Sequence, residues 1–346
     1  MPSQLITVSY GELIRTTLEH YWRGCAKPIQ ITLASSGNLL SHKLQTLIKT
    51  RLPVTDQLLM HRFRGARIRG LMAARGGDLV RAEQLFVAAR ALLELNKLSP
   101  EGTLLYKSFQ QKAESYLDYL RGDFDQARKR TTEALEINVV LEEEYGYELL
   151  FLDRIQLVHN LVRIDARCMC FERAIELACQ ILSYLEGASK VLSNPDLRGY
   201  EFVAHQSPEL VAAMFAQVTS EIALILAGKN RQVDRDLFAV ASTNLQLQTN
   251  SNCHCHPRSY AWLLVKQAFV SNDIVMFLER ASHFLAGGRS DTPLLWYATV
   301  IDLVALCKEL DLPDSEFVKQ VIAKEAASWE YLPQKFFPLL GVCPKT

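Results

Sequence analysis

The residues best suited to metal chemistry form one short run in the second half of the chain: Cys253, His254, Cys255 and His256. Thiolates and imidazoles are good zinc ligands. In an extended segment, however, residues two apart face the same way, so the cysteines and the histidines point to opposite sides. The run contains no CxxC pair, and no second cluster offers further ligands at a convincing spacing. We therefore expect a polar loop with free thiols, and neither a metal site nor a cofactor.

Motifs of the common catalytic sites, such as the P-loop, GxGxxG, GxSxG and HExxH, are absent from the sequence. The segment 287–290 sets Arg289 beside a glycine pair that could hold an anion, but its place between two predicted helices favours a plain loop. The lone helical histidines His159 and His283 are of a kind more often packed or solvated than catalytic. We therefore predict that the protein is not an enzyme, with an all-α enzyme or metal protein using residues 253–256 as an alternative.

The composition is that of an ordinary globular protein. The 346 residues include 38 basic and 38 acidic side chains and are 49% hydrophobic, which excludes a disordered or fibrous chain. A net charge of zero argues against a protein that coats nucleic acid or binds membranes through a polybasic surface. Residues 1–10 show no basic region followed by an apolar core, so we expect a cytoplasmic protein whose cysteines are reduced thiols.

The elements that must position any site are predicted to be helices. Apolar residues recur at intervals of three and four, as from Leu79 to Leu93, and strand signals are almost absent. The stretch 210–228 is interrupted by polar residues at helical spacing, so we interpret it as a buried helix and not as a membrane span. Helices are expected to begin where a serine or threonine precedes a proline and to end at glycines. With these signals the expected helix pairs are 54–75 with 79–96, 101–121 with 124–139, 144–168 with 171–186, 207–228 with 231–247, 257–270 with 273–285, and 292–310 with 314–328.

A repeat is visible in the segments 76–89 and 121–134. Ala82 recurs as Ala127, 45 residues later, and as Ala174, a further 47 residues on. Over residues 60–190 the sequence resembles the tetratricopeptide repeat family, because the first copy matches small and aromatic signature positions at Gly70, Ala82, Phe86 and Ala89. The second copy has Ser115 and Thr131 at two signature sites, and the pitch near 45 instead of 34 requires longer helices or larger loops.

The resemblance implies an α-solenoid of antiparallel helix pairs wound as a right-handed superhelix. We expect residues 1–52 to form capping helices for the first pair, since repeat arrays need such caps. Residues 53–190 would form the tetratricopeptide-like pairs, and 191–206 an insertion that acts as a hinge. Residues 207–328 would form degenerate pairs, and 329–346 an aromatic tail that seals the last pair, with an exposed ligand for another protein as its alternative.

In folds of this family the first helix of each pair lines a concave groove. Carried over to this sequence, the groove positions are basic and aromatic with no acidic member: Arg64, Arg67, Arg75, Phe109, Lys112, Tyr116, Tyr119, Gln156, His159, Arg163 and Arg167. Such a groove favours an anionic partner despite the zero net charge. Against this, arginines at other positions of the helix 60–75 show that part of the charge is simply solvated, and Glu142, Glu143 and Glu144 could neutralise part of the groove.

The sequence therefore predicts a non-enzymatic protein–protein interaction module, an adaptor or regulatory scaffold, whose groove binds an acidic or peptide segment of another protein. One alternative is a regulatory sensor that binds a small ligand or signalling peptide between its two helical halves. Nucleic-acid binding through Arg121, Arg128, Lys129 and Arg130 is a further alternative, which the net neutrality disfavours.

Overall fold

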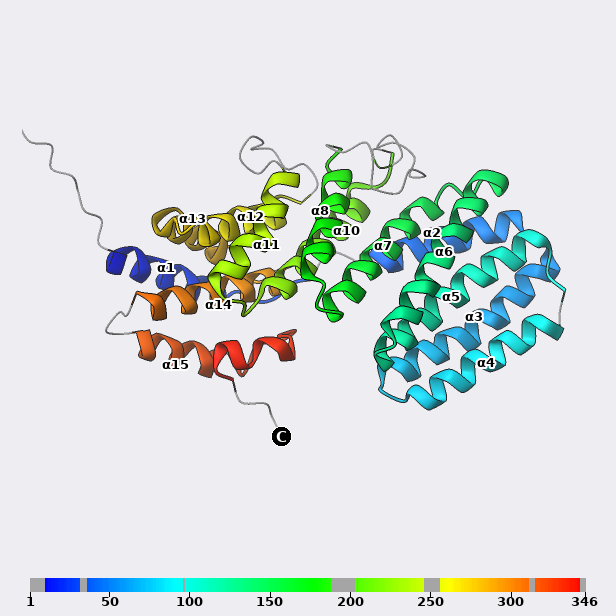
Figure 1. Ribbon diagram of the computed structural model, residues 1–346, viewed down its shortest axis with the longest axis horizontal. Coiled ribbons are helices and arrows are strands. Elements are labelled where there is room, and N and C mark those ends of the chain that lie inside the picture. The colour runs from blue at the N-terminus through cyan, green and yellow to red at the C-terminus, as the bar shows by residue number, and fades with distance from the viewer. Residues whose placement is uncertain are drawn as a thin grey trace, which may run out of the picture. The chain divides into compact units, whose positions relative to one another are not determined.

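The computed structural model describes residues 10–31, 36–95, 97–187, 203, 205–245, 256–310 and 315–342, and every regular element in these ranges is helical (Figure 1). The helices form two compact units. The central unit contains α2 (Ser36–Arg51), α3 (Val54–Arg75), α4 (Leu79–Leu95), α5 (Pro100–Arg121), α6 (Phe124–Tyr145), α7 (Leu150–Arg167) and α8 (Phe171–Leu185). The C-terminal unit contains α1 (Tyr10–Cys25), α10 (Pro208–Leu226), α11 (Arg231–Asn244), α12 (Pro257–Val270), α13 (Ile274–Ala286), α14 (Pro293–Glu309), α15 (Ser315–Ala326) and the short η1 (Gln334–Phe336) and η2 (Pro338–Leu340).

The predictions of an all-α protein and of helices packed in neighbouring pairs are confirmed for the described residues. The largest difference in helix bounds lies at the α6–α7 connection. We predicted that the first helix ends at 139 and the second begins at 144, whereas α6 continues to Tyr145 and α7 begins at Leu150. Gly146 ends α6 in the left-handed conformation, with φ of 66°, a role that glycine fills without steric penalty.

Local chemistry explains where α5 begins and ends. Ser99 caps the helix, because its hydroxyl oxygen accepts a hydrogen bond from the backbone N–H of Gly102 at 3.1 Å. The same serine donates from its backbone N–H and its hydroxyl to the buried carboxylate of Asp56 on α3, which ties the start of α5 to its neighbour. The helix ends at Gly122, whose φ of 82° confirms the predicted glycine end.

The small residues of the repeat serve close packing between paired helices. A Cβ on Gly70 would lie 2.5 Å from Cε1 of Phe86, so the ring of α4 packs directly on the backbone of α3. In the next pair the corresponding residues are Ser115 and Thr131, whose buried hydroxyl oxygens lie 2.7 Å apart in a hydrogen bond. The second copy thus replaces a ring-on-glycine contact with a buried hydrogen bond. The helices α3, α5 and α6 have 22 residues each, which accounts for the long pitch.

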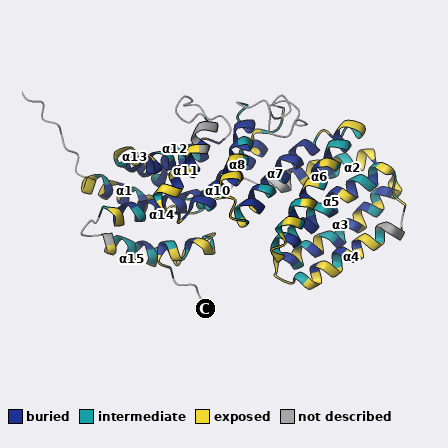
Figure 2. Cartoon of the chain, viewed as in Figure 1, coloured by how far each residue is buried: buried dark blue, intermediate teal, exposed yellow. Residues whose placement is uncertain are grey.

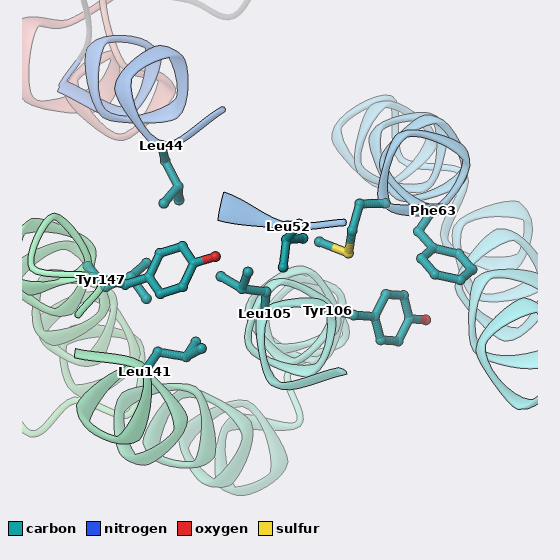
Figure 3. Packing of buried hydrophobic residues seen from close by; sticks show 9 residues of the cluster. Leu44, Leu52, Phe63, Leu105, Tyr106, Leu141 and Tyr147 are labelled. Carbon is teal, nitrogen blue, oxygen red and sulfur yellow. The ribbon is translucent and has the colours of Figure 1, made fainter. Parts of the chain in front are cut away.

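The core of the central unit includes a cluster that joins α2 to four other helices (Figure 3). Leu44 of α2 and Leu52 pack with Phe63 and Tyr106, whose rings meet edge to face at 4.7 Å. The cluster is completed by residues of α3, α5, α6 and α7 and the segment before α7: Met60, Leu105, Leu141, Tyr147 and Leu150. Because α2 contacts both α3 and α7, it lies across the first halves of the helices that we predicted to line a groove.

We expected residues 1–52 to cap the first helix pair, and of the two helices in that segment α2 contacts α3 of that pair. The same helix also packs with residues of α5 and α7, so its contacts extend beyond the first pair. The other helix, α1, belongs to the C-terminal unit and packs on α13. Thr17 donates to the carbonyl of Leu278, and a Cβ on Gly24 would lie 1.9 Å from the carbonyl oxygen of Leu285, so the two helices approach closely at that point. Amphipathic periodicity predicts such helices but does not name the neighbour that buries them.

In the C-terminal unit, the described part of the tail packs inward. Trp329, Phe336 and Leu340 are buried, as expected of a tail that seals the last helix pair, whereas Tyr331 is exposed. Within the described ranges α10 alone is long and apolar enough to cross a membrane, and 67% of its apolar window is buried inside the structure. The core helix of a soluble protein shares these properties, so this is weak evidence for a membrane span. Most of the predicted hinge at 191–206 lies outside the described residues, and its role stays a prediction.

Candidate partner-binding surfaces

The nine residues that we predicted to contact a partner come from three helices of the central unit. Arg64, Arg67 and Arg75 lie on α3, Lys112, Tyr116 and Tyr119 on α5, and His159, Arg163 and Arg167 on α7. We call the surface that these residues define the α3–α5–α7 surface. On α5 and α7 these residues follow the segment over which α2 packs.

A first group of predicted residues meets where α3 and α5 are neighbours. The guanidinium of Arg67 lies over the ring of Phe109, 4.7 Å from its centroid. Lys112 forms an ion pair with Asp153, a buried residue of α7. Asn138 also donates to Asp153 at 3.1 Å and accepts from Ser108 at 2.6 Å, so the carboxylate sits in a buried hydrogen-bond network. The predicted set lacked an acidic member, but the structure places Asp153 beside Lys112, where it neutralises that charge.

Burial changes the chemistry of two predicted cations. Burial lowers the pKa of Arg67 to about 10, with the positive charge of Arg64 acting in the same direction, and the guanidinium stays protonated at neutral pH. Burial, with a smaller effect from Arg163, lowers the pKa of His159 well below its usual value. His159 is therefore a neutral, buried side chain at neutral pH, 5% exposed, and not a surface cation.

A second group forms an aromatic and cationic cluster farther along the helices. The rings of Tyr116 and Tyr119 stack with centroids 6.4 Å apart, and Tyr119 meets Phe124 edge to face. The guanidinium of Arg167 lies over Tyr119, 5.7 Å from the ring centroid. Arg163 and Arg167 are exposed. Cation–π contacts of this kind hold an arginine in place while its fork of N–H donors can still reach a carboxylate.

The remaining predicted residues, Arg64 and Arg75, flank a feature that the sequence analysis missed. Four large apolar side chains of α3 are exposed: Val54 (70%), Leu58 (62%), Ile68 (39%) and Met72 (65%). Their spacing of four, ten and four residues places them on one side of the helix, opposite the buried Phe63, Gly70 and Ala74. We call these four residues the α3 stripe, and Figure 2 shows exposed positions along α3.

Arginines border the α3 stripe on both sides. Arg62 and Arg69 follow one flank and Arg64 and Arg75 the other, as helical spacing requires. A Cβ on Gly65, in the middle of the stripe, would lie 4.0 Å from Nη1 of Arg69, so that guanidinium lies against the stripe. None of the four arginines forms an ion pair with another residue in the described ranges. The signal was present in the sequence, as apolar residues at heptad spacing on the arginine-rich helix 54–75.

The structure also bears on the alternatives. Three of the four cations considered for nucleic-acid binding are paired within the protein: Arg121 with Glu83, Arg128 with Asp165, and Arg130 with Glu114 and Asp118. Across the described residues no cluster of three or more His, Cys, Asp or Glu side chains could hold a metal ion. Cys253, His254 and Cys255 lie outside those residues, whereas His256 is buried and its ring nitrogen accepts from the backbone N–H of Ser259, capping α12.

Comparisons of the chain with protein-family models, with curated proteins and with solved structures find no match. The resemblance to tetratricopeptide repeats therefore rests on the residues named above.

Proposed function

We propose that the protein is a non-enzymatic protein–protein interaction module, an adaptor or regulatory scaffold, which binds an acidic helical segment of another protein. The observation that carries the proposal is the α3 stripe with arginines on both flanks. Exposed apolar side chains at heptad spacing suit the apolar face of a partner helix, and cations beside them suit carboxylates on that helix. The α3–α5–α7 surface would extend the contact through the exposed Arg163 and Arg167.

The proposal includes a tetratricopeptide-like solenoid as the scaffold of the central unit. Two observations support it. The packing of Phe86 on Gly70 matches what the repeat signature requires, and α3 packs against both its pair partner α4 and the first helix of the next pair, α5. The cytoplasmic location and a ligand held between the two units stay predictions.

A direct test uses two synthetic amphipathic peptides with a fluorescent label. Both carry leucine at the a and d heptad positions; one carries glutamate at e and g, the other lysine. Fluorescence anisotropy of each peptide with the full chain measures the affinity. We expect the glutamate peptide to bind and the lysine peptide to bind at least tenfold more weakly, with the difference shrinking as salt is raised.

Charge-reversal variants then locate the surface. Arg62→Glu with Arg69→Glu should weaken binding of the glutamate peptide at least tenfold if the α3 stripe is the site. The matched control, Arg81→Glu with Lys129→Glu, makes the same charge change at exposed positions of α4 and α6 and should leave the affinity within about twofold.

A third variant, Arg163→Glu with Arg167→Glu, measures the contribution of the α3–α5–α7 surface at its exposed residues. Equal affinity of the wild-type chain for the two peptides would refute an acidic partner. Equal loss in the stripe variant and its control would show that only overall charge matters, and would refute the assignment of the site.

A further inference from the structure

The C-terminal unit contains a pocket of about 570 Å³ that the proposed function does not use. Volumes of roughly 300–1,000 Å³ are usual for pockets that bind small molecules. The end of α1 and the segment after it form one wall, through Trp22, Cys25, Ala26, Pro28 and Ile29. The end of α15 and the following turn form another, through Glu325, Ser328, Trp329 and Glu330, and Arg289 completes the lining.

Trp329, in the wall of the pocket, packs against two further aromatic rings. Trp329 stacks on Tyr297 with ring centroids 5.0 Å apart and planes 11° from parallel, and it meets Trp296 edge to face. Tyr21 also stacks on Trp296, with ring centroids 5.4 Å apart. Trp22 on the opposite wall is 42% exposed. The pocket therefore offers a fixed indole and an accessible one to an apolar group.

Two opposite charges line the pocket without neutralising each other. Arg289 donates from Nη2 to the backbone carbonyl of Cys25 at 2.9 Å and lies over the ring of Trp296. The guanidinium also interacts with the hydroxyl of Tyr297, and its buried Nε–H has no acceptor in good hydrogen-bond geometry. Glu325 accepts a hydrogen bond from the hydroxyl of Tyr21. Among the described residues neither charged group forms an ion pair, although both charges act on the pKa of the Cys25 thiol, in opposite directions.

A further polar group in the pocket lining has only a weak hydrogen-bond partner. The indole N–H of Trp329 interacts with the Cys25 thiol, which is a weak acceptor, and has no oxygen or nitrogen partner. Trp329 is only 8% exposed, and buried donors without a good acceptor are rare in native structures. Burial raises the pKa of the Cys25 thiol, an effect that the positive charge of Arg289 opposes, so the thiol stays protonated at neutral pH.

We propose that this pocket binds a small zwitterion, a free α-amino acid with an apolar side chain. The guanidinium of Arg289 would take the carboxylate, since its planar fork of donors matches two carboxylate oxygens. The carboxylate of Glu325 would take the ammonium group, and Trp22 and Trp329 would enclose the apolar side chain. The site lies wholly within the C-terminal unit, so the proposal is independent of partner binding on the central unit.

The experiment is isothermal titration of the full chain with L-leucine and L-phenylalanine, followed by the N-acetyl derivative and the amide of whichever binds more tightly. We expect the free amino acid to bind with a Kd below about 1 mM. The N-acetyl derivative lacks the ammonium and the amide lacks the carboxylate, so each should bind at least tenfold more weakly. Binding should also change the tryptophan emission, because two indoles line the pocket.

Two conservative variants test which residue binds the ammonium group of the amino acid and which binds its carboxylate. Glu325→Gln, which can still accept from Tyr21, should weaken binding of the free amino acid but not of its N-acetyl derivative. Arg289→Lys should weaken binding of the free amino acid more than that of its amide. Arg15→Lys on α1 and Glu316→Gln on α15 are matched controls at exposed positions and should change nothing.

Binding of neither amino acid below about 1 mM would overturn the proposal. So would an N-acetyl derivative that binds as tightly as the free amino acid, which would indicate a simple organic anion site. Unchanged affinity in both Glu325→Gln and Arg289→Lys, with the wild-type tryptophan emission retained in the absence of ligand, would place the amino acid elsewhere and would equally refute the assignment.

Discussion

Lys266 of α12 is the charged side chain whose loss should most weaken the C-terminal unit. It is 2% exposed, and its ammonium lies 2.7 Å from a carboxylate oxygen of Asp234 on α11 and 2.9 Å from one of Asp302 on α14. It also lies over the ring of Phe269, 4.8 Å from the centroid. One buried cation therefore links three helices and balances one of two buried anions.

Replacing Lys266 with methionine keeps most of the side-chain volume and removes the charge. Removing one partner of a buried ion pair typically costs about 3–5 kcal/mol, because the other charge is left buried without compensation. Here two carboxylates are left, so we expect a loss in the upper part of that range at neutral pH. The variant that also carries Asp234→Asn and Asp302→Asn leaves no buried charge, and we expect it to recover about half of the loss or more.

The pH dependence has a defined sign. Burial raises the pKa of Asp234 from 3.8 to about 6, against the opposing effect of Lys266, and burial also raises the pKa of Asp302. A folded-state pKa above the unfolded value means that the folded state binds more protons between the two values. The contribution of Asp234 to stability is therefore fully present below pH 3.8 and is lost as pH rises through about 6, by up to ~3 kcal/mol. Without Lys266 both carboxyls should titrate higher still, so the destabilisation by Lys266→Met should shrink as the pH is lowered from 8 to 5.

The tryptophans provide an assay that is specific for this unit. All four, at positions 22, 262, 296 and 329, lie in the C-terminal unit, whereas the central unit holds only tyrosines and phenylalanines as aromatic residues. Guanidinium unfolding followed by tryptophan emission therefore reports the C-terminal unit, and circular dichroism reports both. We expect Lys266→Met to move the tryptophan-detected transition to a lower guanidinium concentration. The part of the dichroism transition that reports the central unit should keep its midpoint. An unshifted tryptophan transition at pH 8, or a shift of equal size at pH 5, would refute the reasoning.

Three smaller substitutions test single contacts. Gly70→Ala should destabilise the central unit by about 1–3 kcal/mol, seen by dichroism and not by tryptophan emission, because the added methyl meets the ring of Phe86. Ser99→Ala removes the cap of α5 and should cost about 1 kcal/mol by the same measurement; no change would mean that another acceptor takes over the first-turn N–H groups. Gly24→Ala should lower the tryptophan-detected midpoint, because its methyl would collide with the carbonyl of Leu285, and an unchanged midpoint would contradict the close approach of α1 to α13.

The fold was predictable from the sequence where local signals decide it. Glycine ends such as Gly77 and Gly122, and the serine–proline start at Ser99, act within one helical turn, so helix bounds followed from them. The placement of α1 did not follow, because its buried face, which includes Ile14 and Leu18, would suit any apolar neighbour. Only the three-dimensional structure shows that the neighbour is α13, far away in the sequence.

The candidate sites were predictable to a smaller extent. The register of the repeat selected Arg67 and Lys112 as groove residues, and the structure places them beside Phe109 and Asp153, but the register could not show that Asp153 pairs with the lysine. The pocket was harder, since its lining comes from segments near positions 25, 289 and 329 that no periodicity connects. Arg289 stood out in the sequence as a possible anion ligand, and its aromatic surroundings became apparent only in the folded chain.

The zero net charge conceals how the charges of the central unit are distributed. On α5 and α6 cations meet carboxylates, as Lys112 does with Asp153 and Arg128 with Asp165. The arginines beside the α3 stripe have no such partners among the described residues. The electrostatic potential is therefore positive around the exposed apolar side chains of the stripe. Two copies of this surface would bring arginines against arginines, and repulsion of like charges would oppose their pairing. The surface is therefore better suited to a different chain that supplies carboxylates, which is why the peptide experiment varies charge while keeping the leucines constant.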